Sequence, residues 1–235
     1  MNPSRRGLYA VYLAAAICVC GIAVGLRLSV PEEVADYVSK GFLLPFFRYG
    51  LLFALIACGV VLSGESRPIA LIANLAVLVS ALWFGLHRAE TIVLSYEALV
   101  ELILRYPVLV TAMGMITGGA LLFPLRLRRW LAPFVSAGCG LGLGLFIILE
   151  SPLDYYYGWF SSAGGLGGLA VIIASIALAN GARRICASAS LAVAERIFAS
   201  WLIAASLLLA ALAIVPQRSF ESEPMSTPIP DRIEP

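Results

Sequence analysis

Long hydrophobic runs separated by short polar segments fill the chain from its start to about residue 215. A helix that crosses a bilayer needs about 20 predominantly apolar residues, and most of these runs approach that length. The pattern predicts an all-α fold, a polytopic transmembrane helix bundle of about seven spans. The predicted spans cover about residues 8–26, 43–63, 69–87, 107–123, 131–149, 159–180 and 198–215.

Residues 1–216 therefore form one predicted transmembrane helical domain. Residues 217–235 are rich in Pro, Ser and Glu, a composition typical of a disordered C-terminal tail. The first run has two interpretations, because Arg5 and Arg6 precede it and the small residues at 23–25 resemble a cleavage site. Its length exceeds the roughly 7–15 residues of a signal core, which favours a retained helix, and cleavage would leave six spans.

Two segments between the spans are amphipathic. Residues 29–40 predict a short helix that lies flat on the membrane, with valines at four-residue spacing on its apolar side. Residues 88–106 are mixed, and Glu97, Glu101 and Arg105 share one helical face. This second segment is either an interfacial helix or an outer extension of the fourth span.

Glycines recur at four-residue spacing in the predicted fourth, fifth and sixth spans. Such small residues allow neighbouring membrane helices to approach closely, so we expect tight packing in this half of the bundle. The pairs are Gly114 and Gly118, Gly138 and Gly142, Gly140 and Gly144, and Gly164 and Gly168.

Composition and charge agree with a membrane protein and suggest its orientation. The chain is 61% hydrophobic and 13% charged, and its mean hydropathy is +0.94. If the seven spans cross the membrane in alternating directions, the side of the N-terminus carries nine basic and two acidic residues. The other side then carries seven basic and twelve acidic residues. The positive-inside rule then predicts a cytoplasmic N-terminus and a periplasmic or extracellular tail, and the membrane that we expect is the bacterial inner membrane.

Three polar residues near or within the spans are candidates for a solute path or for helix joining. Arg48 lies between aromatic residues, where it either snorkels to the headgroups or serves a buried function. Asn74 is predicted near mid-membrane, where it lines a path or joins two helices by hydrogen bonds. Glu101 belongs to the acidic face of residues 88–106.

A metal site has weaker support. His87, Glu150 and Asp154 are the candidates, because an acidic outer side with one histidine could attract a cation. Ordinary solvated carboxylates explain the same residues, and no metal-binding spacing occurs within a span. The five cysteines lie mostly in apolar runs and indicate neither a disulfide framework nor a metal site. No cofactor is predicted, and no basic stripe with aromatic residues indicates nucleic acid.

The segment at 196–205, Arg-Ile-Phe-Ala-Ser-Trp-Leu-Ile-Ala-Ala, resembles the closing helix of the hydrogenase/urease accessory membrane family. That family consists of small multi-helix bacterial inner-membrane proteins linked to nickel uptake, so the resemblance implies a nickel permease-type fold. The family's His-rich motifs with nearby Asp are absent, and His87 is the only histidine in the chain. The resemblance therefore transfers no metal ligand.

Two functions remain open. The first is a permease-like protein that moves a small solute or ion. The second is a non-catalytic subunit or assembly factor of a larger membrane complex, which the scarcity of charge within the spans favours. No catalytic set is visible, so we do not predict an enzyme. The expected partners are the lipid bilayer and either other membrane subunits or further copies of this chain.

Overall fold

The computed structural model describes residues 21, 24–25, 30–65, 67–95, 107–151, 157–186 and 188–214. All regular secondary structure in these residues is helical. The helices are α2 (Glu32–Phe47), α3 (Tyr49–Ser63), α4 (Pro68–Ser95), α6 (Pro107–Leu122), α7 (Leu125–Glu150), α8 (Tyr157–Ile185) and α9 (Ser188–Ile214).

Within this described part, four helices are long and apolar enough to cross a membrane: α4, α7, α8 and α9. Helices α2 and α3 pass the same test as a pair, so they form either one broken span or a re-entrant loop, and α6 is apolar but shorter. The chain is thus a membrane protein with four or five candidate spans in the described residues. The predicted first span at 8–26 lies largely outside them, and the total of about seven stays a prediction.

The α2–α3 region differs from the sequence prediction. A separate surface helix at 29–40 was expected, followed by a span from 43, but α2 continues to Phe47 and the chain then bends by 76°. Pro45 lacks the N–H that would bond the carbonyl of Gly41, and this weakens the last turn of α2. The backbone leaves the helical region at Arg48, where φ is −109° and ψ is 86°.

Helix α2 also packs on protein along its apolar side. Val34 and Val38 are buried with Ala163 of α8. A Cβ added at Gly41 would lie 2.3 Å from the carbonyl oxygen of Phe160, and one added at Gly167 would lie 2.2 Å from that of Phe42. The backbones of α2 and α8 therefore meet through two glycines that the predicted four-residue pairs did not include.

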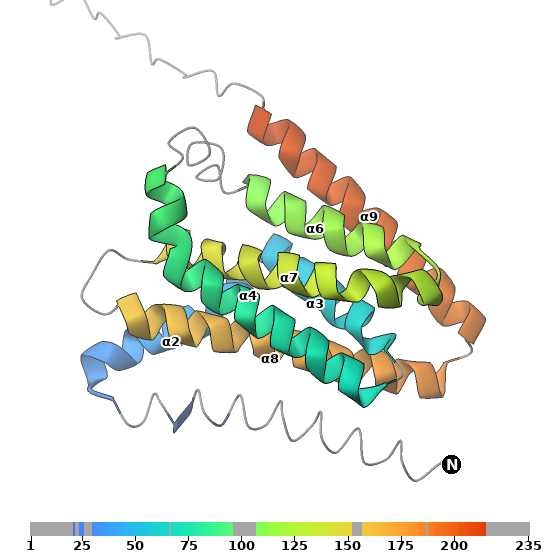
Figure 1. Ribbon diagram of the computed structural model, residues 1–235, viewed down its shortest axis with the longest axis horizontal. Coiled ribbons are helices and arrows are strands. Elements are labelled where there is room, and N and C mark those ends of the chain that lie inside the picture. Colours follow the sequence, from blue (N-terminus) through green and yellow to red (C-terminus); the bar gives the residue numbers. More distant parts are fainter. Residues whose placement is uncertain are drawn as a thin grey trace, which may run out of the picture.

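Helix α3 occupies the centre of the bundle. It packs mainly against α8, α6 and α7, and further contacts reach α2 and α9. Leu51, Leu55 and Leu62 are fully buried. This explains why α3 is apolar on all sides, since a helix surrounded by other helices has no polar face. Around it, α4 packs chiefly on α7 and α6 chiefly on α9 (Figure 1).

Several predicted glycine positions lie at close helix contacts. A Cβ added at Gly140 would lie 2.3 Å from the carbonyl oxygen of Leu78, and one added at Gly144 would lie 2.7 Å from that of Leu82. Both neighbours belong to α4, so these two glycines bring the backbones of α4 and α7 together. At Gly138 an added Cβ would meet only the side chain of Ile116 at 3.6 Å, an ordinary contact.

The other predicted glycines face three helices. Gly114 and Gly118 of α6 lie against α9, and an added Cβ at Gly114 would lie 2.2 Å from the Ser206 hydroxyl oxygen. The remaining three meet large side chains rather than backbone. Gly142 faces Met113 of α6, Gly164 faces Ile147 of α7, and Gly168 faces Leu143 of α7.

The helices turn back at two ends of the bundle, which we name by their acidic residues. The Glu195 end holds the α3–α4, α6–α7 and α8–α9 connections, which gather on the right in Figure 1. The Glu150 end holds the α2–α3 bend, the end of α7 and the start of α8. The predicted spans at 159–180 and 198–215 leave residues 185–196 as a connector, but α9 begins at Ser188. Glu195 therefore lies within a helix, about two turns from its start.

Candidate functional site

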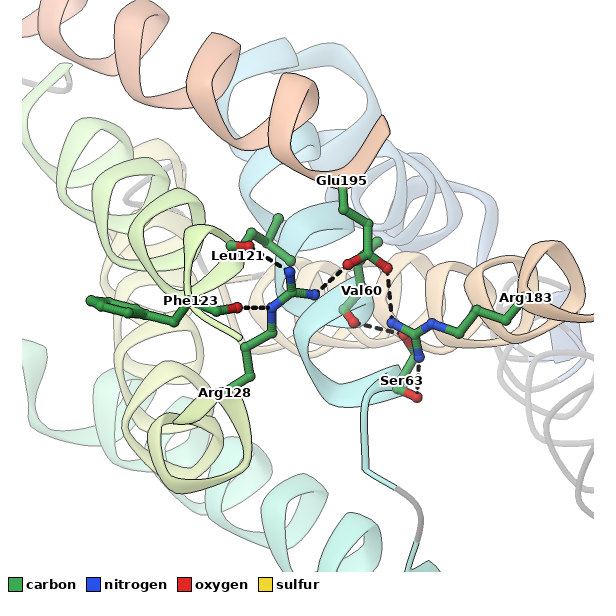
Figure 2. A network of polar contacts seen from close by, with 7 residues as sticks. All are labelled: Val60, Ser63, Leu121, Phe123, Arg128, Arg183 and Glu195. Atoms are coloured by element: carbon green, nitrogen blue, oxygen red, sulfur yellow. Dashed lines mark hydrogen bonds and ion pairs between the residues drawn. The ribbon is translucent and has the colours of Figure 1, made fainter. Parts of the chain in front are cut away.

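The best-defined polar site is a group of three charged side chains at the Glu195 end, which we call the Glu195 cluster. Glu195 of α9 lies between Arg128 of α7 and Arg183 of α8 (Figure 2). One carboxylate oxygen, Oε2, accepts a hydrogen bond from Arg128 Nη1, and the other, Oε1, accepts one from Arg183 Nη2 at 3.0 Å. One carboxylate thus joins the ends of three helices.

The guanidinium of Arg128 also closes the end of a fourth helix. Its Nε donates to the carbonyl oxygen of Phe123 at 2.9 Å, and its Nη2 donates to that of Leu121. Both acceptors lie at the C-terminus of α6, where carbonyl groups lack partners within the helix and carry partial negative charge. The Arg128 side chain is only 7% exposed, so these contacts replace almost all of its hydration.

Arg183 likewise closes the C-terminus of the central helix α3. Its Nη1 donates to the carbonyl oxygen of Ser63, the last residue of α3. The hydroxyl of Ser63 in turn donates to the carbonyl oxygen of Val60 at 2.6 Å. With both arginines bound to Glu195, the cluster connects the ends of five helices: α3, α6, α7, α8 and α9.

A cavity of about 320 Å³ adjoins the Glu195 cluster. Arg128, Arg183 and Glu195 form one part of its wall, and Arg196 forms another. The formal charge of this lining is positive, with three guanidinium groups against one carboxylate. The remaining lining residues are all apolar: Phe123, Pro124, Leu125, Leu191 and Ala192.

A second ion pair lies at the Glu150 end. Arg48 Nη2 donates to both carboxylate oxygens of Glu150, at 2.8 and 2.9 Å. The two side chains are 44% and 23% exposed. Each charge is unfavourable for its own helix, because Arg48 precedes the positive N-terminus of α3 and Glu150 ends α7 at its negative C-terminus. Pairing the two groups offsets both effects.

This pair also borders a cavity, of about 300 Å³. Its charged lining residues are Lys40, Arg48 and Glu150, and its apolar ones are Leu44, Phe47 and Phe160. Lys40 is paired with Asp36 along α2, with 2.6 Å between Nζ and Oδ2. Cationic groups outnumber carboxylates in this lining as well.

The predicted metal candidates do not come together in the described residues. His87 is exposed on α4, stacks on Trp83 at 4.3 Å between ring centroids, and has its Nδ1 3.0 Å from the Trp83 carbonyl oxygen. Glu150 is paired with Arg48. Asp154 and Glu101 lie outside the described residues. Within the described part, no three His, Cys, Asp or Glu side chains are grouped as a metal site would require.

Asn74 is buried, with an exposed fraction of 5%. It lies on the same stripe of α4 as Leu71, Leu78 and Leu82, which are also buried. Since α4 packs chiefly on α7, this stripe faces α7. Asn74 is therefore in a position to join these two helices or to border a path between them.

Sequence reasoning missed the Glu195 cluster, although a signal was present. Glu195 is one of only two acidic residues on the side predicted to hold the N-terminus. An isolated carboxylate among many arginines beside an apolar run is a natural partner for them. Comparison of the chain with protein-family models, curated proteins and solved structures found no match.

Proposed function

We propose that the protein is a permease-like component of a bacterial inner membrane that moves a small solute. One observation carries this proposal. Two charge-lined cavities, of about 320 and 300 Å³, lie at opposite ends of α7 and α8, and both helices contribute residues to each lining. A solute that crosses the bundle from one cavity to the other would meet a polar site on entry and another on exit.

The bend between α2 and α3 supports the proposal. Discontinuous membrane helices often form the binding sites of transporters, because their free backbone groups and helix ends contact the solute. Here the 76° bend falls at Arg48, which lines the cavity at the Glu150 end. In either a broken span or a re-entrant loop, the bend places a helix N-terminus and a guanidinium beside this cavity.

The charge of both cavities bears on the kind of solute. The three guanidinium groups at the Glu195 end and Lys40 with Arg48 at the Glu150 end favour an anionic or polar neutral solute. The acidic outer side had suggested attraction of a cation. The one carboxylate in the cavity at the Glu150 end, that of Glu150, is bound by Arg48.

Hydroxyl groups at Thr111, Thr117, Ser136 and Ser175 can bond to the backbone of their own helices, and two of the four do. Thr117 of α6 donates to the carbonyl oxygen of Met113 at 2.8 Å, and Ser175 of α8 donates to that of Val171 at 2.7 Å. The hydroxyls of Thr111 on α6 and Ser136 on α7 have no hydrogen-bond partner among the described residues. Unpaired buried polar groups are uncommon, and sites for water or a solute are one explanation.

The test is uptake by proteoliposomes that contain the purified full-length chain. The panel comprises phosphate, sulfate, acetate and glycerol as small anionic and neutral probes. We expect at least one to enter faster than into protein-free liposomes, and Arg48→Gln to slow this entry. Arg88→Gln, an exposed arginine of α4, is the matched control. Entry of every probe at the protein-free rate would contradict the proposal.

A second candidate is a non-catalytic subunit or assembly factor of a membrane complex. It is favoured by the absence of charged residues from α3 and from α7 between Arg129 and Glu150, since ion-coupled carriers usually need charges there. Native mass spectrometry after mild-detergent extraction tests it. A stoichiometric partner protein would support this candidate, and a lone monomer or homo-oligomer would count against it.

A further inference from the structure

We propose that the cavity at the Glu195 end binds a phosphate-type oxyanion through the guanidinium groups of Arg128, Arg183 and Arg196. This proposal concerns binding alone and does not depend on transport. It rests on the charge balance of the cluster, on the hydrogen-bond donors that remain, and on the depth of the cavity in the membrane.

The cavity at the Glu195 end has more positive than negative charge. The side chains of Arg128 and Arg183 are only 7% and 23% exposed, and the single carboxylate of Glu195 lies between them at 12%. Two guanidinium groups and one carboxylate leave one positive charge largely removed from water. Arg196, which is exposed, adds a second charge to the same cavity. The carbonyl groups of Leu121, Phe123 and Ser63 offer the two arginines only partial negative charge, so a full negative charge in the cavity would stabilise the cluster further.

The guanidinium of Arg183 has more hydrogen-bond donors than its contacts use. A guanidinium has five N–H groups. The contacts of Arg183 with the described residues use one N–H toward Ser63 and one toward Glu195, so further donors remain on a side chain that lines the cavity. Guanidinium groups bind phosphate in a bidentate manner, and charge-assisted hydrogen bonds are the stronger kind. An oxyanion therefore fits the chemistry of this wall better than a neutral solute does.

The length of α7 indicates how deep in the membrane the cavity lies. From Arg128 to Glu150, α7 rises about 33 Å at 1.5 Å per residue, close to the roughly 30 Å of a hydrocarbon core. This places the Glu195 cluster near the headgroups of one leaflet. Basic pockets between membrane helices at this depth bind anionic lipid headgroups. The apolar remainder of the wall, such as Leu125 and Leu191, suits a lipid chain. The phosphate thus belongs either to a lipid or to a free anion.

The experiment uses delipidated full-length protein in detergent. Native mass spectrometry measures binding of phosphatidylglycerol and of phosphatidylcholine, and a thermal melt measures stabilisation by inorganic phosphate against chloride at equal ionic strength. If the source is a lipid, phosphatidylglycerol binds at least about tenfold more tightly than phosphatidylcholine, since both share a phosphate and only one has net charge. If the source is a free anion, inorganic phosphate raises the melting temperature and the two lipids bind alike.

Two variants test whether the anion or lipid binds in this cavity. Arg196→Gln removes an exposed guanidinium without disturbing the Glu195 cluster, and it should weaken the observed binding about tenfold, as expected for one lost charged contact. Arg184→Gln changes the neighbouring exposed arginine of α8, which does not line the cavity, and should leave binding unchanged. Equal binding by the wild type and Arg196→Gln, or binding of neither probe by the wild type, would overturn the proposal.

Discussion

The two ends of the bundle are held together differently. At the Glu195 end, three largely buried charges connect five helices and close the C-termini of α3 and α6. At the Glu150 end, Arg48 and Glu150 form a pair that is 44% and 23% exposed. There α2 is packed on α8 at Gly41 and Gly167, where an added Cβ would collide with a carbonyl oxygen of the other helix.

This difference indicates which interactions determine stability at each end. An exposed ion pair contributes little, because water already solvates both charges well. A buried carboxylate between two arginines is different, since its removal leaves both cations with backbone carbonyl groups but without their anionic partner. We therefore expect electrostatics to dominate at the Glu195 end and close backbone packing at the Glu150 end.

The strongest test of the comparison is Glu195→Ala. Breaking a buried ion pair costs about 3–5 kcal/mol, and we expect a loss of this size in the free energy of unfolding. The measurement is chemical denaturation in detergent micelles, followed by tryptophan fluorescence. Glu32→Ala, at an exposed position in the first turn of α2, is the control and should change stability little. Equal losses in the two variants would refute the buried-cluster account.

The second test moves to the Glu150 end. In Gly167→Ala the new Cβ would lie 2.2 Å from the Phe42 carbonyl oxygen, so α2 and α8 must separate. Overpacking of this kind costs about 1–3 kcal/mol. Gly181→Ala on the same helix meets nothing within 4 Å and should leave stability unchanged or slightly raised. The same denaturation assay applies, and a neutral Gly167→Ala would show that close packing does not hold this end.

The smallest expected effect concerns the Arg48–Glu150 pair. A double-mutant cycle with Arg48→Gln and Glu150→Gln should give a coupling energy of at most about 1 kcal/mol, because both side chains contact water. Added salt should lower the coupling further. The equivalent cycle on Arg128 and Glu195 should give a larger coupling that salt changes less. Similar values for the two cycles would remove the distinction between the ends.

The sequence predicted the helices better than their ends. Apolar runs identified α6, α8 and most of α9, because membrane helices are marked by length and hydropathy. The predicted spans exclude the charged segments at 126–130 and 185–196, yet most of both is helical. A helix does not end where its apolar run ends, since charged residues at its end are stabilised by partners on other helices.

Those partners could not be found from periodicity. Arg48 and Glu150 are 102 residues apart, and Arg128 and Glu195 are 67 apart. Spacing within one helix shows which residues share a face but not which helix that face meets. The same limit applies to the glycines. The four-residue pairs identified Gly140 and Gly144, whereas Gly41 and Gly167 belong to no such pair and were missed.

The most direct test of the central claim is which side of the membrane each end faces. Two proteins, each with a single cysteine, are labelled with a membrane-impermeant maleimide. One keeps Cys186, which is exposed at the Glu195 end, and the other carries Lys40→Cys at the Glu150 end. The other cysteines are replaced by alanine, and intact cells are compared with inverted vesicles. We expect Lys40→Cys to react in cells and Cys186 to react only in inverted vesicles. Labelling of both from the same side would contradict two cavities that open on opposite faces.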